Sequence, residues 1–265
     1  MEPRRNAGKV ILWIFGIFIA VFGMMLLLNK CGAFGENSPL TALNTEKNMY
    51  DPALFRQDGE FIRYGDDSLL GVDVSSHQGE IDWQAVADAG MDFAIIRVAY
   101  RGYTDGGLHE DTTFVQNYEG ATAAGLKVGA YLFSQAISES EAVDEAEFVL
   151  DCLDGRKLDL PVYYDWEIID GDVRTQDVEP GKLTGFADAF CEMVQRFGYK
   201  GGVYFNQMLG YLGFDLQALS EYDLWLAQYD SKPDFFYHFD MWQYSPQHRV
   251  AGINEDVDVN LRFPQ

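Results

Sequence analysis

The chain has 265 residues, of which 48% are hydrophobic and 15% aromatic, so it can fill a substantial core and is not disordered along its whole length. This length fits one large domain with an appendage. The formal net charge of −23 at pH 7 argues against nucleic acid as a partner, because so negative a field repels a polyanion.

The first feature along the chain is an uncharged apolar run of 19 residues, from position 10 to position 28. A helix of this length crosses the hydrocarbon layer of a membrane, which is about 30 Å thick. Arg4, Arg5 and Lys9 precede the run, and positive charge stays on the cytoplasmic side. We therefore expect a single-pass protein of the cell membrane, with residues 1–9 in the cytoplasm and everything after the run on the cell-wall side.

A cleaved signal peptide is the alternative interpretation of this run. The apolar core of a signal peptide usually has about 7 to 15 residues, and no small-x-small cleavage site follows position 28. These two differences favour an uncleaved transmembrane helix. Cys31 invites a lipoprotein interpretation, but the Leu-Asn-Lys sequence before it lacks the small residues that lipidation needs.

The rest of the chain divides at about position 68. Residues 29–67 are polar, broken by Gly and Pro, and without sustained periodicity, so we expect a stalk there. In residues 68–265, short apolar β-rich segments alternate with amphipathic ones, which predicts repeated βα units around a mainly parallel sheet. The expected strands are residues 69–74, 93–99, 127–133, 160–167, 201–205, 223–228, 239–244 and 257–263.

The loops between the last three of these strands are too short for full helices. The predicted fold class is therefore α/β: an irregular (β/α)-barrel of eight strands, with five βα units followed by three β-strands with little helix, preceded by one transmembrane helix. Capping signals define one of the helices. Ser138 followed by Glu141 forms a capping box before a helix over residues 142–153, and Gly155 stands where a C-terminal cap belongs.

Cysteine and histidine are scarce in this chain. Cys31, Cys152 and Cys191 share no close spacing, and only four histidines occur, so a tetrahedral zinc site has little support. Calcium-loop spacing is absent as well. We expect no metal and no cofactor. Cys152 and Cys191 both fall on expected helices, where they are explained as buried apolar residues; a disulfide between them stays open.

An apolar strand at residues 160–167, with the sequence LPVYYDWE, ends in two acids two positions apart. Residues i and i+2 of a strand project from the same face, about 6 to 7 Å apart. Asp165 and Glu167 should therefore point the same way at the C-terminal mouth of the barrel, where such folds build their active sites. Glycosidic bond cleavage needs one carboxyl to protonate the leaving oxygen and another to stabilise or capture the positive charge on the sugar.

Two further acids follow the same end-of-strand pattern. Asp73 lies in the sequence GVDVSSHQG at residues 71–79, and Asp258 lies in VDVN at residues 257–260. All four acids can converge on one mouth, where like charges raise one another's pKa and keep a carboxylic acid protonated near neutral pH. Asp73 and Asp258 are therefore catalytic candidates beside Asp165 and Glu167.

Aromatic residues and an amide cluster at the same strand ends. Aromatic faces and a few polar groups are typical of a ligand site, and sugar rings use both. The substrate-binding candidates are Tyr131, Phe133, Tyr204, Trp242 and Gln243. Alternation along a strand indicates that one member of each aromatic pair faces inward. Neither a Gly-x-Ser-x-Gly elbow nor a phosphate-binding glycine loop occurs, so serine hydrolase and nucleotide-binding functions have no support.

These residues resemble the glycoside hydrolase family 25 lysozymes, also called cellosyl or Chalaropsis-type muramidases. The resemblance is collinear over residues 69–263 and is carried by GVDVS with QG, GAYLF, DWE, WQY and VDVN. It implies an irregular barrel without metal or cofactor. It also implies hydrolysis of the β-1,4 bond between N-acetylmuramic acid and N-acetylglucosamine in the glycan strand of peptidoglycan.

The resemblance further implies a role for each acid. Glu167 would be the general acid, and Asp165 would position or stabilise the charged intermediate, with the substrate's own acetamido group as a further participant. Asp73 and Asp258 would shape the floor of the site and tune these pKa values. Retention or inversion at the anomeric carbon stays open.

Two other functions compete with an active muramidase. A membrane-tethered glycan-binding or scaffold protein would keep the groove without turnover. A chitin-like substrate is the second, because chitinase strands also end in Asp-x-Glu, but those strands carry a further acid where this chain has Tyr163. The family often has cell-wall-binding repeats, whereas a membrane anchor is expected here, which favours wall remodelling or wall-spanning assembly at the membrane.

Overall fold

The computed structural model describes residues 45–264. The predicted cytoplasmic segment 1–9, the predicted transmembrane helix 10–28 and the first part of the predicted stalk, 29–44, lie outside the described residues. Between residues 45 and 264, the helices are all too short or too polar to cross a membrane.

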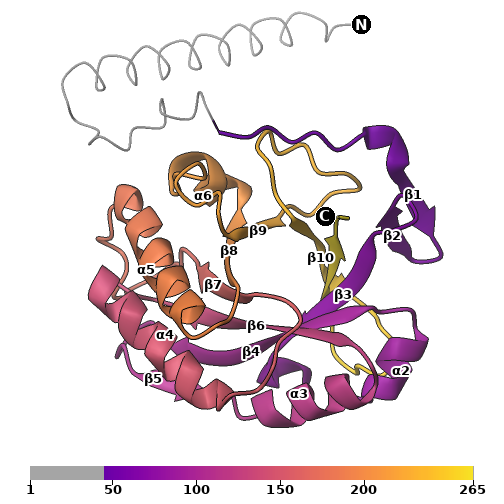
Figure 1. The fold of residues 1–265 in the computed structure, drawn as a ribbon, viewed down its shortest axis with the longest axis horizontal. Coiled ribbons are helices and arrows are strands. Elements are labelled where there is room, and N and C mark those ends of the chain that lie inside the picture. The colour runs from indigo at the N-terminus through magenta and orange to yellow at the C-terminus, as the bar shows by residue number, and fades with distance from the viewer. Residues whose placement is uncertain (1–44, 265) are drawn as a thin grey trace, which may run out of the picture. The chain divides into compact units, whose positions relative to one another are not determined.

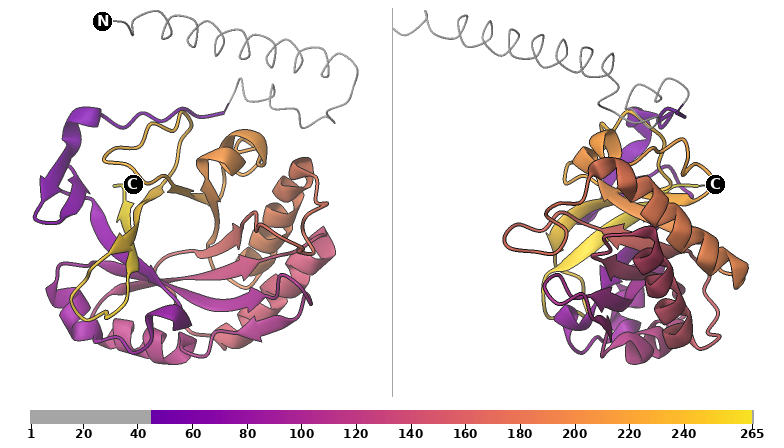
Figure 2. Two further views of the ribbon diagram at one scale, coloured as in Figure 1. Left: turned by 180° about the vertical axis from the view of Figure 1, so that it is seen from behind. Right: turned by 90° about the vertical axis from the view of Figure 1, so that its left-hand side faces the viewer.

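Eight strands close into a barrel, which Figures 1 and 2 show from three sides. Seven of the strands run parallel to one another: β3 (Leu69–Val74), β4 (Phe93–Arg101), β6 (Lys127–Ser134), β7 (Val162–Trp166), β8 (Gly201–Asn206), β9 (Asp223–Ala227) and β10 (Met241–His248). The eighth, β11 (Val257–Arg262), runs antiparallel to both neighbours, β10 and β3. Pairing of β3 with β4 closes the ring, and the predicted eight-stranded barrel is confirmed.

A helix follows each of the first five barrel strands. These helices are α2 (Trp83–Asp88), α3 (Phe114–Ala123), α4 (Glu139–Leu153), α5 (Leu183–Arg196) and α6 (Gln207–Leu212). Short 3-10 helices occupy Pro52–Leu54, Ser76–Gln78 and Pro180–Lys182. In the described chain no helix follows β9, β10 or β11, so one side of the barrel is left without helical cover (Figure 1). The sequence did not predict β5 (Leu108–Glu110), which pairs with the outer end of β4.

Local signals place α4 close to the predicted bounds. The Ser138 hydroxyl caps its N-terminus by accepting a 3.2 Å hydrogen bond from the amide of Glu141. The reciprocal half of the predicted capping box differs, because the Glu141 carboxylate accepts from the amide of Ile137 rather than of Ser138. The left-handed C-terminal cap begins at Asp154, with φ 45°, one residue before Gly155. Cys152 and Cys191 are both free thiols.

Side chains alternate between two apolar clusters on the two sides of the sheet. The larger cluster lies between the sheet and the elements outside it, and the smaller one fills the barrel. The inward residues include Phe93, Tyr163 and Trp225. Glycines make room for these rings: a Cβ at Gly71 would lie 2.4 Å from the Phe93 ring, and a Cβ at Gly202 would lie 2.4 Å from the Tyr163 ring.

The second half of the predicted stalk belongs to the domain. Residues 55–64 form a hairpin of β1 (Phe55–Asp58) and β2 (Phe61–Tyr64), and the Tyr50 ring stacks on Phe263 with centroids 3.6 Å apart. These aromatic residues cover the β10 and β11 side of the barrel, which has no helix of its own. Burial of that apolar side explains why a polar segment without periodicity is nevertheless folded.

Candidate active site

The C-terminal ends of the parallel barrel strands and the start of β11 surround a pocket of about 290 Å³. Its lining combines four carboxyl groups with aromatic rings and one amide: Asp73, Tyr131, Phe133, Asp165, Glu167, Tyr204, Trp225, Tyr229, Gln243, Pro246 and Asp258. The acids come from three different strands or strand ends, so only closure of the barrel brings them together.

Strand β7 carries the central acid. Its outward residues, such as Tyr164, are fully buried against the outer layer, and alternation turns Tyr163 and Asp165 into the barrel. Asp165 pairs across the sheet with Phe133 of β6 and Tyr204 of β8. Glu167 follows one residue after the strand ends and remains half-buried.

Asp165 has an oxygen without a protein partner. The residue is 6% exposed, and its Oδ1 is the only buried side-chain oxygen or nitrogen in residues 45–264 that makes no hydrogen bond. A buried carboxylate oxygen without a partner is costly, so such an atom in a pocket is a site that a ligand donor can satisfy.

Asp73 and Asp258 face each other across the seam between β3 and β11, where they are directly paired in the antiparallel register. Asp73 Oδ2 accepts hydrogen bonds from Gln243 Nε2 at 2.9 Å and from Asn260 Nδ2 at 2.7 Å. Asn260 is itself fixed by the indole N–H of Trp225, which donates to its Oδ1 at 2.9 Å. Buried amides therefore hold the Asp73 carboxyl in one orientation.

The four carboxyls perturb one another's pKa. Burial raises the pKa of Asp165 well above its usual range, and the negative charges of Glu167 and Asp73 raise it further. Burial and the charge of Asp73 also raise the pKa of Glu167. The titrations of Asp165 and Glu167 are linked, so the pair retains a proton near neutral pH and titrates as a unit.

The second carboxyl pair is shifted in the same direction. Burial, followed by the charge of Asp73, raises the pKa of Asp258 to about 9. Burial also raises the pKa of Asp73, although the hydrogen bonds from Asn260 and Gln243 oppose that effect. At neutral pH the site therefore retains protons that isolated carboxyls would have lost, which is the condition for general acid catalysis by a carboxyl group.

The sequence pattern of the family described as "Glycosyl hydrolases family 25" matches residues 72–253, which include β3, β7 and most of the barrel. The chain belongs to this family. The matched span contains three of the four acids, Asp73, Asp165 and Glu167. Asp258 lies five residues after its end.

Several family 25 proteins and related chains are similar to this one. The autolytic lysozyme of Clostridium acetobutylicum is 28% identical over 197 residues, covering 72% of this chain and 55% of that protein. The protein YegX of Escherichia coli K12 is 30% identical over 211 residues, covering 73% of this chain and 69% of YegX. This chain thus spans about half the length of the autolytic lysozyme.

Several solved structures share the barrel. The lysozyme from Streptomyces coelicolor superimposes with a TM-score of 0.61 at 27% identity, covering 72% of this chain and 90% of that one. The family 25 hydrolase of Bacillus anthracis has a TM-score of 0.64 at 24% identity, with coverage of 79% and 96%. The autolysin LytC of Streptococcus pneumoniae, at 21% identity and a TM-score of 0.65, matches over 79% of this chain and 52% of its own.

The structure brings eight of the nine predicted site residues of this family 25 chain to the pocket. Trp242 is the exception, because Gln243 faces inward and alternation turns its neighbour outward. Trp242 is fully buried outside the barrel, where its indole N–H donates to the carbonyl of Gln228 at 2.7 Å and its ring lies edge-on to Phe55. The prediction that Trp242 binds substrate is therefore corrected to a structural role.

Three lining residues were not predicted: Trp225, Tyr229 and Pro246. Alternation could have identified Trp225. Ala227 faces into the barrel on β9, and the residue two positions earlier, Trp225, points the same way. Tyr229 and Pro246 offered no signal, because one lies in the loop after β9 and the other beyond a bulge of β10. Within residues 45–264, no group of three or more His, Cys, Asp or Glu side chains is arranged to hold a metal ion.

Proposed function

We propose that this family 25 protein is a muramidase that hydrolyses the β-1,4 bond between N-acetylmuramic acid and N-acetylglucosamine in peptidoglycan. The observation that carries the proposal is the pair of carboxyls with raised pKa, Asp165 and Glu167, in a pocket lined with aromatic rings. Similar proteins are named lysozymes, among them those of Clostridium acetobutylicum and Streptomyces globisporus.

In the proposed reaction the proton that the pair retains lies on Glu167 once the glycan is bound, and Glu167 donates it to the glycosidic oxygen as the bond to the leaving sugar breaks. Positive charge then develops at the anomeric carbon, and a negative Asp165 stabilises it. The unpaired Oδ1 of Asp165 is suited to accept the N–H of the substrate's acetamido group. That contact would orient the acetamido oxygen toward the anomeric carbon. Water then bonds to that carbon, and a carboxylate of the site takes up the proton that the water loses.

Peptidoglycan digestion with full-length protein in mild detergent tests the activity. Products reduced with borohydride and weighed by mass spectrometry reveal which sugar carries the new reducing end. Muramitol ends support the proposal, whereas glucosaminitol ends would mean that a different bond is cut. Saturable binding of peptidoglycan fragments without soluble products would instead identify a glycan-binding protein.

We further propose that residues 10–28 anchor the protein in the cell membrane, with the barrel on the cell-wall side. The uncharged run and the preceding Arg4, Arg5 and Lys9 support this orientation. An anchored muramidase would act on wall close to the membrane, in remodelling or in wall-spanning assembly. Alkaline carbonate strips peripheral proteins from membranes and leaves spanning proteins in place. If it released a protein that still had its full-length mass, the anchor would be contradicted.

A further inference from the structure

The backbone of Glu167 lies beyond the hydrogen-bonded ladder that fixes the rest of β7. The register between β6 and β7 ends with Ser134 opposite Trp166. A residue outside the ladder needs another partner for its carbonyl group. The Gln135 side chain supplies that partner: its Nε2 donates to the carbonyl oxygen of Glu167 at 3.0 Å.

The amide of Gln135 is fixed in a single orientation. The side chain is fully buried, and its Nε2 also donates to the carbonyl of Ser134 at 2.9 Å. Its Oε1 accepts the hydroxyl proton of Thr175 at 3.1 Å. Two carbonyl acceptors on one side require the NH₂ group there, so a flipped amide would lose all three hydrogen bonds.

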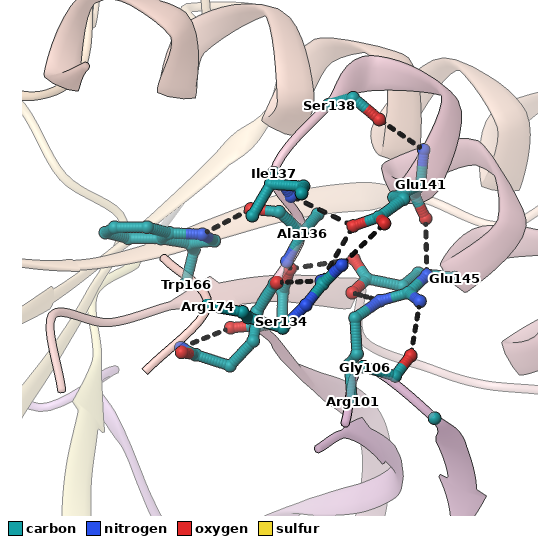
Figure 3. A network of polar contacts seen from close by, with 12 residues as sticks. Arg101, Gly106, Ser134, Ala136, Ile137, Ser138, Glu141, Glu145, Trp166 and Arg174 are labelled. Atoms are coloured by element: carbon teal, nitrogen blue, oxygen red, sulfur yellow. Dashed lines mark hydrogen bonds and ion pairs between the residues drawn. The ribbon is translucent and has the colours of Figure 1, made fainter. Parts of the chain in front are cut away.

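Neighbouring side chains hold the same two chain segments together. The indole N–H of Trp166 donates to the carbonyl of Ala136 at 3.0 Å, and Arg174 Nη1 donates to the carbonyl of Gln135 at 2.6 Å. Arg174 also forms a two-pronged ion pair with Glu141 of α4, at 2.6 and 2.7 Å. Figure 3 shows the Trp166 and Arg174 contacts around the turn that follows β6.

We propose that Gln135 is a positioning residue for Glu167, an inference that rests on the proposed glycoside hydrolysis. By holding the Glu167 carbonyl, Gln135 fixes the peptide plane from which the Glu167 side chain reaches Asp165 and the glycosidic oxygen. Gln135 does not line the pocket. Its contribution is orientation, and misplacement of a reacting group by about 1 Å costs on the order of a hundredfold in rate.

Two substitutions test this role in the full-length protein, with soluble peptidoglycan oligomers as substrate. Gln135→Met keeps the length of the side chain and removes both hydrogen-bonding groups. We expect kcat to fall about tenfold to a hundredfold while KM changes less than about twofold, because binding of the glycan does not use Gln135.

Gln135→Glu gives a pH signature that a purely structural role would not produce. When protonated, the introduced carboxyl donates to one carbonyl; when ionised, it repels both carbonyl oxygens. The ratio of variant to wild-type kcat should therefore rise as the pH falls. This variant also keeps the acceptor for the Thr175 hydroxyl, so it serves if Gln135→Met does not fold.

Asn117→Leu is the matched control, since Asn117 is a buried amide on α3 that is 1% exposed and does not contact the site. It accepts from Trp83 Nε1 and donates to the Thr113 hydroxyl. We expect this variant to lose thermal stability with kcat unchanged. A wild-type kcat in Gln135→Met, a pH-independent ratio in Gln135→Glu, or an equal loss of kcat in Asn117→Leu would each overturn the proposal. An inactive wild type would instead refute the proposed function.

Discussion

Gln243 donates a hydrogen bond to Asp73 across 170 positions of sequence, from Nε2 to Oδ2 at 2.9 Å. Two tyrosine hydroxyls, those of Tyr204 and Tyr229, donate to Oε1 of the same amide, each at 3.0 Å. Because both tyrosines occupy the oxygen, the nitrogen must face Asp73. The amide thus connects the outer wall of the pocket, where Tyr229 is exposed, to the carboxyl cluster at its floor.

Removal of this amide should shift the pH dependence of catalysis. In Gln243→Leu the Asp73 carboxylate loses a donor, so the pKa of Asp73 rises and Asp73 is less often negative near neutral pH. With less negative charge beside them, Asp165 and Glu167 release their shared proton at lower pH. We expect the basic limb of the profile of kcat/KM against pH to move to lower pH. Tyr229→Phe removes only one contact to Gln243 and should shift that limb less; an unmoved limb in Gln243→Leu would contradict this coupling.

Glu167→Gln should abolish cleavage and preserve the fold. Loss of a general acid costs about 10²- to 10⁴-fold in rate, and the amide is nearly isosteric with the carboxyl. Turnover of peptidoglycan measures the loss, and binding of peptidoglycan fragments measures whether the groove survives. Glu119→Gln, at an exposed position on α3, is the control and should keep full activity. Full turnover by Glu167→Gln would refute the assignment of Glu167 as the acid.

The carboxyl cluster should lower the stability of the fold at neutral pH. Asp258 has a pKa of about 9 in the folded protein, so between pH 4 and pH 9 the folded chain binds a proton that the unfolded chain has lost. Folding stability contributed by this group therefore falls as the pH rises through that window. Asp258→Asn should regain about 1 kcal/mol or more of folding stability at pH 7. Each kcal/mol regained raises the melting temperature by roughly 2–4 °C.

Melting curves at pH 4 and pH 7 check this expectation. At pH 4 the wild-type carboxyl is protonated in the folded state and, with an ordinary pKa of 3.8, close to half protonated in the unfolded state, so the difference between the two proteins should shrink. A stabilisation that is equal at both pH values would point to packing rather than to charge. The same variant should be less active, as is common where a site stores electrostatic strain.

Trp242 and Tyr229 should respond differently to substitution, because Trp242 is buried outside the barrel and Tyr229 lines the pocket. Trp242→Phe removes one of two donors to the carbonyl of Gln228, which keeps the amide of Asp230, and should cost about 0.5–1.5 kcal/mol of stability, with KM unchanged. Tyr229→Ala removes an exposed ring at the mouth of the pocket and should raise KM with little change in melting temperature. A raised KM in Trp242→Phe would restore the original prediction that Trp242 binds substrate.

The sequence alone predicted most of the barrel and of its carboxyl cluster. The periodicity of strands is local, so the eight barrel strands and the inward direction of Asp165 can be read from short segments such as residues 160–167. Parallel strands share one C-terminal edge, and for that reason Asp73, Asp165 and Glu167 could be assigned to one mouth. Asp258 reaches the same mouth because it lies near the start of β11, which runs antiparallel to its neighbours. The Ser138 cap is local in the same sense.

Only the tertiary structure decided the features that depend on contacts between distant segments. Residues 45–67 look like a stalk because the segment is polar, broken by Gly and Pro, and without periodicity, yet Tyr50 stacks on Phe263, more than two hundred positions away. Likewise, Trp242 and Gln243 are adjacent, so only one of them can face into the barrel. The register of β10 with β9 and β11 determines that it is Gln243. The hydrogen bond from Gln135 to Glu167 depends on how two loops meet beyond the sheet, where no periodic pattern constrains the chain.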